Sequence, residues 1–138
     1  MRTRLLLLVS IALVSVAAGV LMATRFTPAS ASDQATITMH FSHFTPAVVT
    51  VPAGVPVTFV LQNQDPIDHE WIVGTSQVHD RHGLGTEPYH DSVPTEVTVP
   101  ALSIRTTTVH FDRPGEYAFV CHLPGHEVYG MRGIVRVR

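Results

Sequence analysis

Residues 47–62 read AVVTVPAGVPVTFVLQ, and this stretch decides the fold class. Residues 47–51 are rich in β-branched side chains and stop at a turn signal that runs from Pro52 to Gly54. Residues 55–62 then alternate between apolar and other side chains with a period of two. A period of two, interrupted by proline and glycine, indicates two β-strands joined by a turn.

The same pattern recurs on both sides of this stretch. Short apolar or alternating runs bounded by turn residues lie at 35–41, 70–73, 95–99, 105–111, 116–120 and 133–137. No long amphipathic helical pattern follows residue 31. Seven or eight short strands at this spacing predict an all-β fold, an antiparallel sandwich or barrel in one domain. Residues 74–94 and 122–130 carry no strand pattern, and we expect them to be irregular and functional.

The N-terminus has the features of an export signal. Two arginines precede an uncharged, mostly apolar run of 19 residues, 5–23, and a small-residue cleavage pattern ends at Ala31. We predict a signal peptide or N-terminal membrane anchor over 1–31 and a separate domain over 32–138. Cleavage and retention as an anchor both stay open, because the run is close to membrane-spanning length. Either outcome places the domain outside the cytoplasm, secreted, periplasmic or on the outer face of the membrane.

The charge of the chain excludes one class of partner, and its cysteine content excludes one kind of covalent bond. After residue 31 the chain has six arginines, no lysine and eleven acidic residues. Phosphate binding needs a basic face, so nucleic acid is excluded as a partner. The only cysteine is Cys121, which excludes an internal disulfide. The core, or a bound metal, must hold the fold. We expect a monomer.

Cys121 opens the segment CHLPGHEVYGM, residues 121–131. A lone thiol can be a small buried hydrophobe, half of an intermolecular disulfide or a metal ligand. Turns at the glycines would return His126 and Met131 to the end of the strand that carries Cys121. Thiolate, imidazole and thioether together suit copper, with two histidines and one cysteine in a plane and methionine axial. One histidine must then come from elsewhere in the fold.

His69 is the best candidate for the missing histidine, because it directly precedes the predicted strand 70–73. A ligand at the mouth of a sandwich would lie there. His110 falls inside a strand pattern and is expected at the surface. His40 and His43 lie near the first strand and are expected to be structural.

Two segments carry a family resemblance. Residues 117–137, YAFVCHLPGHEVYGMRGIVRV, resemble the copper loop of the cupredoxins, the blue copper proteins that include plastocyanin, azurin and rusticyanin. Residues 45–63, TPAVVTVPAGVPVTFVLQN, are similar to the strand, turn and strand that precede the first copper histidine in that family. The resemblance implies a Greek-key β-sandwich with one type 1 copper per chain. Carried over residue by residue, the copper ligands are His69, Cys121, His126 and Met131.

The chain departs from the family in three places. Glu70 stands after the first histidine, where many members have Asn or Ser, and an ionised carboxylate cannot donate a hydrogen bond to the thiolate. His122 follows the cysteine, but Val120 precedes it, so a trinuclear centre like that of multicopper oxidases is not expected. The third departure is the insertion VHDRHGLGTEPYH, residues 78–90.

The expected function is the shuttling of single electrons between redox partners. A redox protein is expected to dock near His126, because transient redox encounters use small surfaces. The apolar side chains available are Leu123, Pro124, Val128 and Tyr129, although ordinary loop packing would also explain them. No open coordination position or general base is evident, so we do not expect an enzyme.

Copper capture, buffering or delivery outside the cytoplasm is the alternative function. His79, His82 and His90 lie in the insertion and could hold a second Cu(II) or Zn(II) ion. Acidic residues nearby are Asp80, Glu87 and Asp91. A solvated polar loop would have the same composition. A third class, a structural or adhesive sandwich with an incidental thiol, is disfavoured by the joint spacing of the cysteine, histidine and methionine.

Overall fold

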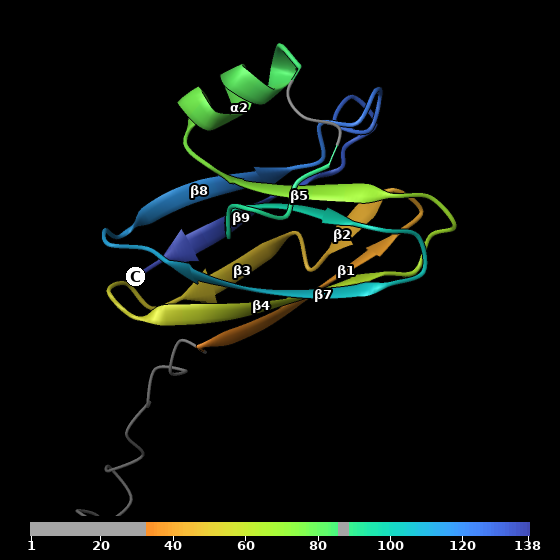
Figure 1. Ribbon diagram of the computed structural model, residues 1–138. Coiled ribbons are helices and arrows are strands. Elements are labelled where there is room, and N and C mark those ends of the chain that lie inside the picture. Colours follow the sequence, from red (N-terminus) through yellow and green to blue (C-terminus); the bar gives the residue numbers. More distant parts are fainter. Residues whose placement is uncertain (1–32, 86–88) are drawn as a thin grey trace, which may run out of the picture. The chain divides into compact units, whose positions relative to one another are not determined.

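The computed structural model describes residues 33–85 and 89–138. These residues form two β-sheets packed face to face, with one short helix outside them (Figure 1). The first sheet has the order β2-β1-β4-β7, formed by His43–Thr45, Gln34–His40, Pro56–Asn63 and Ile104–His110. The second has the order β3-β9-β8-β5-β6, formed by Val48–Val51, Arg132–Val137, Gly115–Val120, His69–Gly74 and Glu96–Val99. The predicted all-β sandwich is confirmed.

The stretch that set the fold prediction forms β3, a turn and β4. Every second side chain of β4 is buried, as the alternation predicts. Gly54 in the turn has a φ of +72°, which glycine adopts without strain. Its N–H donates to the carbonyl oxygen of Phe111, and that of Ala53 donates to Arg138. Because β3 and β4 belong to different sheets, the turn is a crossing between the sheets and not a hairpin.

Two strand pairs are parallel, which differs from the antiparallel arrangement expected from the sequence. β1 pairs with β4, and β3 pairs with β9, in parallel. The path of the chain explains the first of these pairs. After β1 and β2 the chain crosses to β3 in the second sheet, then returns to the first sheet as β4 beside β1. The strand β2 was not predicted, because three residues are too few for a period of two to show.

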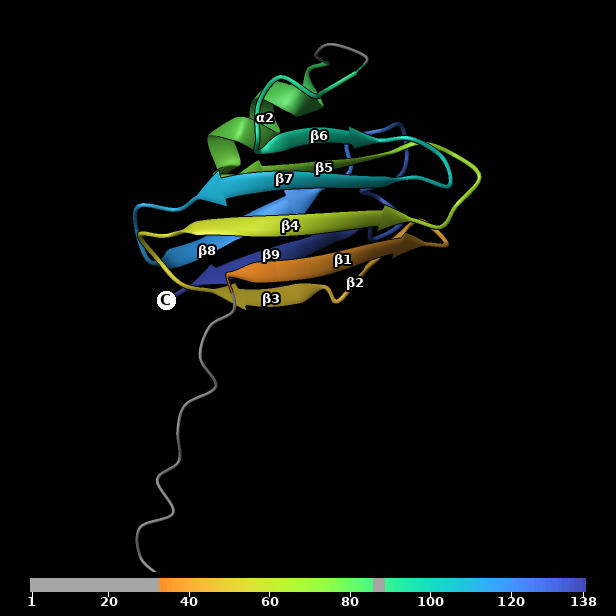
Figure 2. The ribbon, with the colours of Figure 1, turned by 60° about the horizontal axis from the view of Figure 1, so that its bottom comes forward.

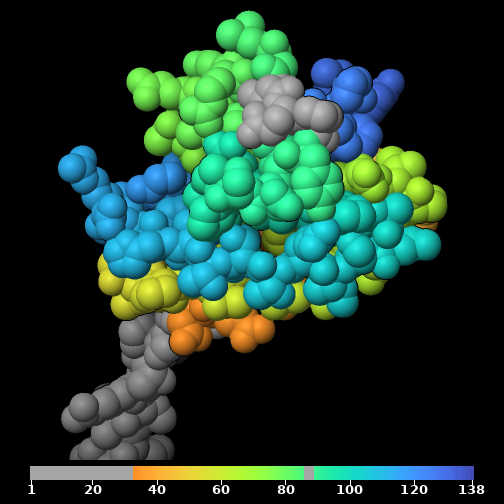
Figure 3. All heavy atoms as spheres, viewed as in Figure 1, coloured from red at the N-terminus to blue at the C-terminus, as the bar shows by residue number. Residues whose placement is uncertain are grey.

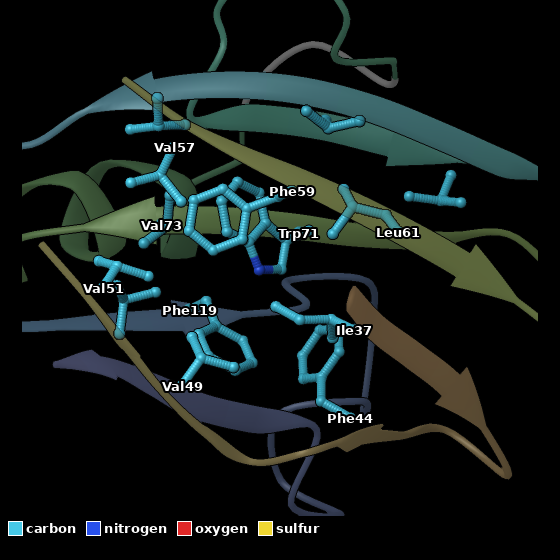
Figure 4. Close-up of a cluster of buried hydrophobic side chains, with 14 of the residues drawn as sticks. Ile37, Phe44, Val49, Val51, Val57, Phe59, Leu61, Trp71, Val73 and Phe119 are labelled. Atoms are coloured by element: carbon cyan, nitrogen blue, oxygen red, sulfur yellow. The ribbon is translucent and has the colours of Figure 1, made fainter. Parts of the chain in front are cut away.

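Apolar side chains from both sheets fill the space between them (Figure 4). Phe59 of β4, Trp71 of β5 and Phe119 of β8 are all fully buried there. The ring centroids of Phe59 and Trp71 are 4.8 Å apart. Burying one large apolar side chain contributes about 1.5–3 kcal/mol. This core holds the strands that carry the candidate site in place without a disulfide.

Helix α2, Ser76–Gly83, corrects the prediction that 74–94 is irregular. Its sequence, SQVHDRHG, has one aliphatic side chain, so no apolar stripe marks it as a helix. Val78 packs directly on Gly74, where a Cβ atom would lie 2.8 Å from Val78 Cγ2. The helix is therefore held against the end of β5, on the outer side of the second sheet (Figure 2).

Residues 1–31, predicted to be a signal peptide or anchor, lie outside the described residues. The boundary between 1–31 and 32–138 therefore stays a prediction. Within residues 33–85 and 89–138, no helix has the length and apolar character needed to cross a membrane.

Candidate metal centre

Cys121 directly follows β8 and is fully buried. The backbone N–H of Glu70 donates to its sulfur, with nitrogen and sulfur 3.3 Å apart. Burial raises the pKa of Cys121 to about 11, although the N–H groups of Glu70 and Leu123 act in the opposite direction. Without a metal, the side chain is therefore a protonated and inaccessible thiol at neutral pH.

The loop after Cys121 folds back on itself as the glycine positions predict. Gly125 and Gly130 have φ angles of +86° and +97°, which side chains other than hydrogen rarely allow. The N–H of Met131 donates to His126 O at 3.0 Å, and the N–H of Cys121 donates to Met131 O at 3.2 Å. These two bonds place His126 and the fully buried Met131 beside the cysteine.

His69 completes the group from the first position of β5. It is fully buried, and its Nδ1 lies 3.2 Å from Nδ1 of His126. The same His126 nitrogen lies 3.3 Å from Cys121 Sγ. One ligand atom from each of these three residues lies within 4.8 Å of the other two. The structure thus brings together the side chains of His69, Cys121 and His126. The backbone bonds of Met131 place this residue, the fourth that the sequence selected, next to Cys121 and His126.

Asp65 is a functional residue that the sequence analysis missed. Its carboxylate accepts hydrogen bonds from the N–H groups of Phe41 and Ser42 and from His69 Nε2, each at 2.8 Å. Burial alone would raise its pKa, but these bonds outweigh burial, and the pKa of Asp65 falls to about 2. An ionised carboxylate only accepts hydrogen bonds. Nε2 of His69 therefore carries the proton, and Nδ1 keeps its lone pair for a metal ion.

The donor atoms fit a soft transition-metal ion. Metal–nitrogen and metal–sulfur bonds of about 2.0 and 2.3 Å would place neighbouring donors about 3–4 Å apart. The two separations at His126 Nδ1, 3.2 and 3.3 Å, lie in that range. Burial, together with the nearby His69, lowers the pKa of His126, while Asp65 opposes the shift. His126 is therefore neutral at pH 7, with a lone pair available for a metal.

The side chains of four other residues that the sequence analysis singled out do not belong to this group of donors. Glu70 donates to the sulfur through its backbone, so its carboxylate does not need to donate. His110 is exposed and pairs with Asp112, as expected for a surface residue. His43 Nδ1 contacts the carbonyl oxygen of Phe41 at 2.7 Å. His40 Nδ1 lies 3.4 Å from Asp65 Oδ1, on the far side of that carboxylate from His69.

The three histidines of the insertion do not gather at one point. His82 and His90 are buried and converge on Glu96, which no sequence pattern had linked to them. His79 instead contacts His122, with Nδ1 and Nε2 3.0 Å apart. Burial, together with the charge of His79 when protonated, lowers the pKa of His122.

Comparison with known proteins identifies the family of the chain. The family described as the cupredoxin-like domain matches residues 6–135. The copper-resistant cuproprotein CopI of Rubrivivax gelatinosus is 34% identical over 98 residues, covering 69% of this chain and 59% of that protein. A second CopI, from Vibrio cholerae, is 33% identical over 88 residues, covering 60% of this chain and 51% of that protein. The chain therefore spans less than two thirds of the length of both relatives.

Solved structures share the fold. Reduced auracyanin from Roseiflexus castenholzii superposes with a TM-score of 0.66 and 21% identity, covering 79% of this chain and 99% of that one. At this identity the likeness concerns the fold alone. The match over residues 6–135 covers most of the sequence, so the chain belongs to the cupredoxin-like family.

Proposed function

We propose that this chain is an exported type 1 copper protein that exchanges single electrons through a centre of two histidines, one cysteine and one methionine. The observation that carries the proposal is the convergence of Cys121 Sγ with the Nδ1 atoms of His69 and His126. Bound copper would supply a one-electron couple between its +1 and +2 states. The names of the CopI relatives support copper as the metal, and the apolar run at 5–23 supports export.

The chain holds these donors rigidly, which favours fast electron exchange. Asp65 fixes the ring of His69, and the Glu70 N–H fixes the cysteine sulfur. The backbone bonds of Met131 tie the end of the loop to both other loop ligands. Side chains held in one geometry need little rearrangement when the charge of the centre changes. We propose no catalytic role.

Exposed apolar side chains lie in the loop that carries His126 and next to Asp65, the partner of His69. Val128 and Tyr129 follow His126 in the loop and are 87% and 76% exposed. Phe41 and Leu102 are also exposed and have left-handed φ angles of +51° and +53°, which cost free energy in non-glycine residues. Both are held there by backbone hydrogen bonds to Asp65. Strained backbone positions cluster at functional sites, and we assign these exposed side chains to docking of a redox protein.

Electron self-exchange between two copies of the chain tests this proposal. Val128→Glu should lower the bimolecular self-exchange rate at least about tenfold, because two copies would bring like charges face to face. The visible spectrum and reduction potential should not change. Val55→Glu is the matched control, because Val55 is also exposed but precedes β4 at the opposite end of the sandwich. Equal rates in the two variants would move docking away from the 121–131 loop.

Copper capture or delivery is the second candidate, favoured by the relatives named as copper-resistant cuproproteins. A delivery protein must release its metal, whereas an electron carrier retains it. The rate of copper loss to a strong Cu(I) chelator separates the two functions. Retention for hours under excess chelator supports electron transfer, and loss within seconds supports delivery.

A further inference from the structure

A second group of potential metal ligands lies between helix α2 and strand β6. His82 comes from α2, His90 precedes β6, and Glu96 is its first residue. The side chains of His82 and His90 are each 1% exposed, and that of Glu96 is 11% exposed. Glu96 Oε2 lies 3.4 Å from His82 Nε2 and 3.9 Å from His90 Nδ1. One ligand atom from each residue lies within 4.8 Å of the other two.

The protonation of His82 leaves a lone pair directed into this group. Nδ1 of His82 lies 2.8 Å from the carbonyl oxygen of Val78, which can only accept, so Nδ1 carries the proton. Nε2 is buried and makes no hydrogen bond within the described part of the chain. In the neutral ring, the Nε2 lone pair therefore faces the Glu96 carboxylate oxygen at 3.4 Å. Two electron-rich atoms held this close inside a protein favour a cation between them.

Neighbouring groups orient the other two residues. Arg81 donates to Glu96 Oε1 at 2.7 Å, which leaves Oε2 facing the histidines. Glu70 Oε1 lies 3.6 Å from His90 Nε2, on the side of the ring away from Glu96. The backbone N–H of His90 also donates a hydrogen bond to Thr98 Oγ1 of β6 at 2.7 Å. Carboxylates or carbonyls on the outer nitrogen are the usual partners of histidines that bind metals.

We propose that His82 Nε2, His90 Nδ1 and Glu96 Oε2 bind a divalent transition-metal ion, separate from the cysteine centre. Two imidazoles and one carboxylate suit Cu(II) and Zn(II), and the general affinity order favours Cu(II). Bonds of about 2.0–2.2 Å to a tetrahedral Zn(II) ion place donors about 3.3–3.6 Å apart. The separation of 3.4 Å between His82 and Glu96 fits this value, and that of 3.9 Å needs a small closure. The carboxylates of Glu70 and Glu96 outnumber the guanidinium of Arg81, and the net negative charge attracts a cation.

This site adjoins the cysteine centre through two residues. The backbone of Glu70 contacts the Cys121 sulfur, while its carboxylate faces His90. The ring of His122, next to Cys121 in the chain, stacks on that of His82 with centroids 5.6 Å apart and an angle of 22°. Figure 3 shows helix α2 in green and the 121–131 loop in dark blue on the same side of the molecule. His79, bonded to His122 and to Ala118 O, is not assigned to the site.

A copper titration of the full chain, followed by visible absorption and electron paramagnetic resonance, tests the proposal. Wild type should bind two equivalents of Cu(II). One gives the thiolate charge-transfer band, and the other gives a signal of nitrogen and oxygen ligation. His82→Gln, His90→Gln and Glu96→Gln should each lose the second equivalent and keep the band at full intensity. His79→Gln is the control and should keep both equivalents, because it changes a part-buried histidine contact outside the group.

The retained band shows that a variant is folded. If a variant lost its band, X-ray absorption of wild type would decide whether a second metal ion binds to His82, His90 and Glu96. The cysteine centre is first filled with one equivalent of copper, and one equivalent of Zn(II) is then added. A zinc edge with two imidazoles, oxygen and no sulfur supports the site. Sulfur ligation of zinc, saturation of wild type at one metal ion, or a second equivalent that survives all three substitutions would overturn it.

Discussion

The carboxylate of Asp65 accepts a hydrogen bond from Nε2 of His69 at 2.8 Å, and this contact decides which nitrogen of His69 can bind metal. The proton stays on Nε2, and Nδ1 faces His126. The same carboxylate holds Phe41 and Ser42 in left-handed conformations through their N–H groups. One buried acid thus sets both the donor atom of the candidate centre and the shape of the surface beside it.

Asp65→Asn should weaken copper binding about 10- to 100-fold, because an amide is a poorer partner for the His69 N–H and lowers the donor strength of the ring. A competition titration against a chelator of known affinity measures this loss. Asp68→Asn is the control, because Asp68 lies in the same loop and its carboxylate accepts from the Ala101 N–H, whereas the carboxylate on the His69 ring is that of Asp65. Equal affinities of the two variants would show that Asp65 does not act through the histidine.

Met131→Leu should keep the copper and raise its reduction potential, because the variant loses a weak axial donor that stabilises Cu(II). Leucine is close to methionine in volume, so the fold should survive. Met39→Leu provides the control, since Met39 is equally buried but lies in β1 within the apolar core. Voltammetry gives both potentials. A potential shared by Met131→Leu and wild type would assign the axial role to another group.

Copper affinity should rise about tenfold per pH unit between pH 7.5 and 9. Burial raises the pKa of Cys121 to about 11, so the thiol loses one proton for each copper bound over this range. His126 adds no proton there, because burial keeps its pKa below the ordinary value of 6.5. Chelator competition at several pH values, corrected for protonation of the chelator, gives the slope. A flat profile would mean that copper does not displace the proton of the Cys121 thiol.

Gly133→Ala should destabilise the fold by about 1–3 kcal/mol or more. A Cβ atom at Gly133 would overlap the ring of Phe119 and lie 2.5 Å from the Ala47 carbonyl oxygen, so β8 and β9 could not keep their pairing. Urea denaturation of the metal-free protein measures the change. Gly83→Ala, in α2, is the control, because its Cβ would meet no atom within 4 Å and alanine favours a helix. Similar midpoints for both variants would contradict this packing.

The sequence predicted the elements whose signals are local. The alternation in 55–62 marked β4, and the glycines of the 121–131 loop marked the turns that bring His126 and Met131 to Cys121. His69 was selected from its position before a strand, and the structure places it in the group. The strand and the turns depend on residues within a few positions of one another, whereas His69 meets His126 across 57 positions and was selected only from its place at a strand.

The features that the sequence did not reveal depend on contacts between distant residues. Helix α2 carries no apolar stripe and is held by the contact of Val78 with Gly74. Glu96 reaches the histidines only because β6 pairs with β5 beneath the helix. Asp65 stands four residues before His69, and that spacing was an available but unused sign of a carboxylate partner.

The most direct test of the central claim is a Cu(II) titration of the full chain and of Cys121→Ser, followed by visible absorption. The geometry at Cys121, His69 and His126 predicts an intense thiolate-to-copper band that saturates at one equivalent in wild type and is absent in the variant. A colourless wild-type protein, one with only the pale bands of nitrogen and oxygen ligation, or a band that survives in Cys121→Ser would contradict the claim.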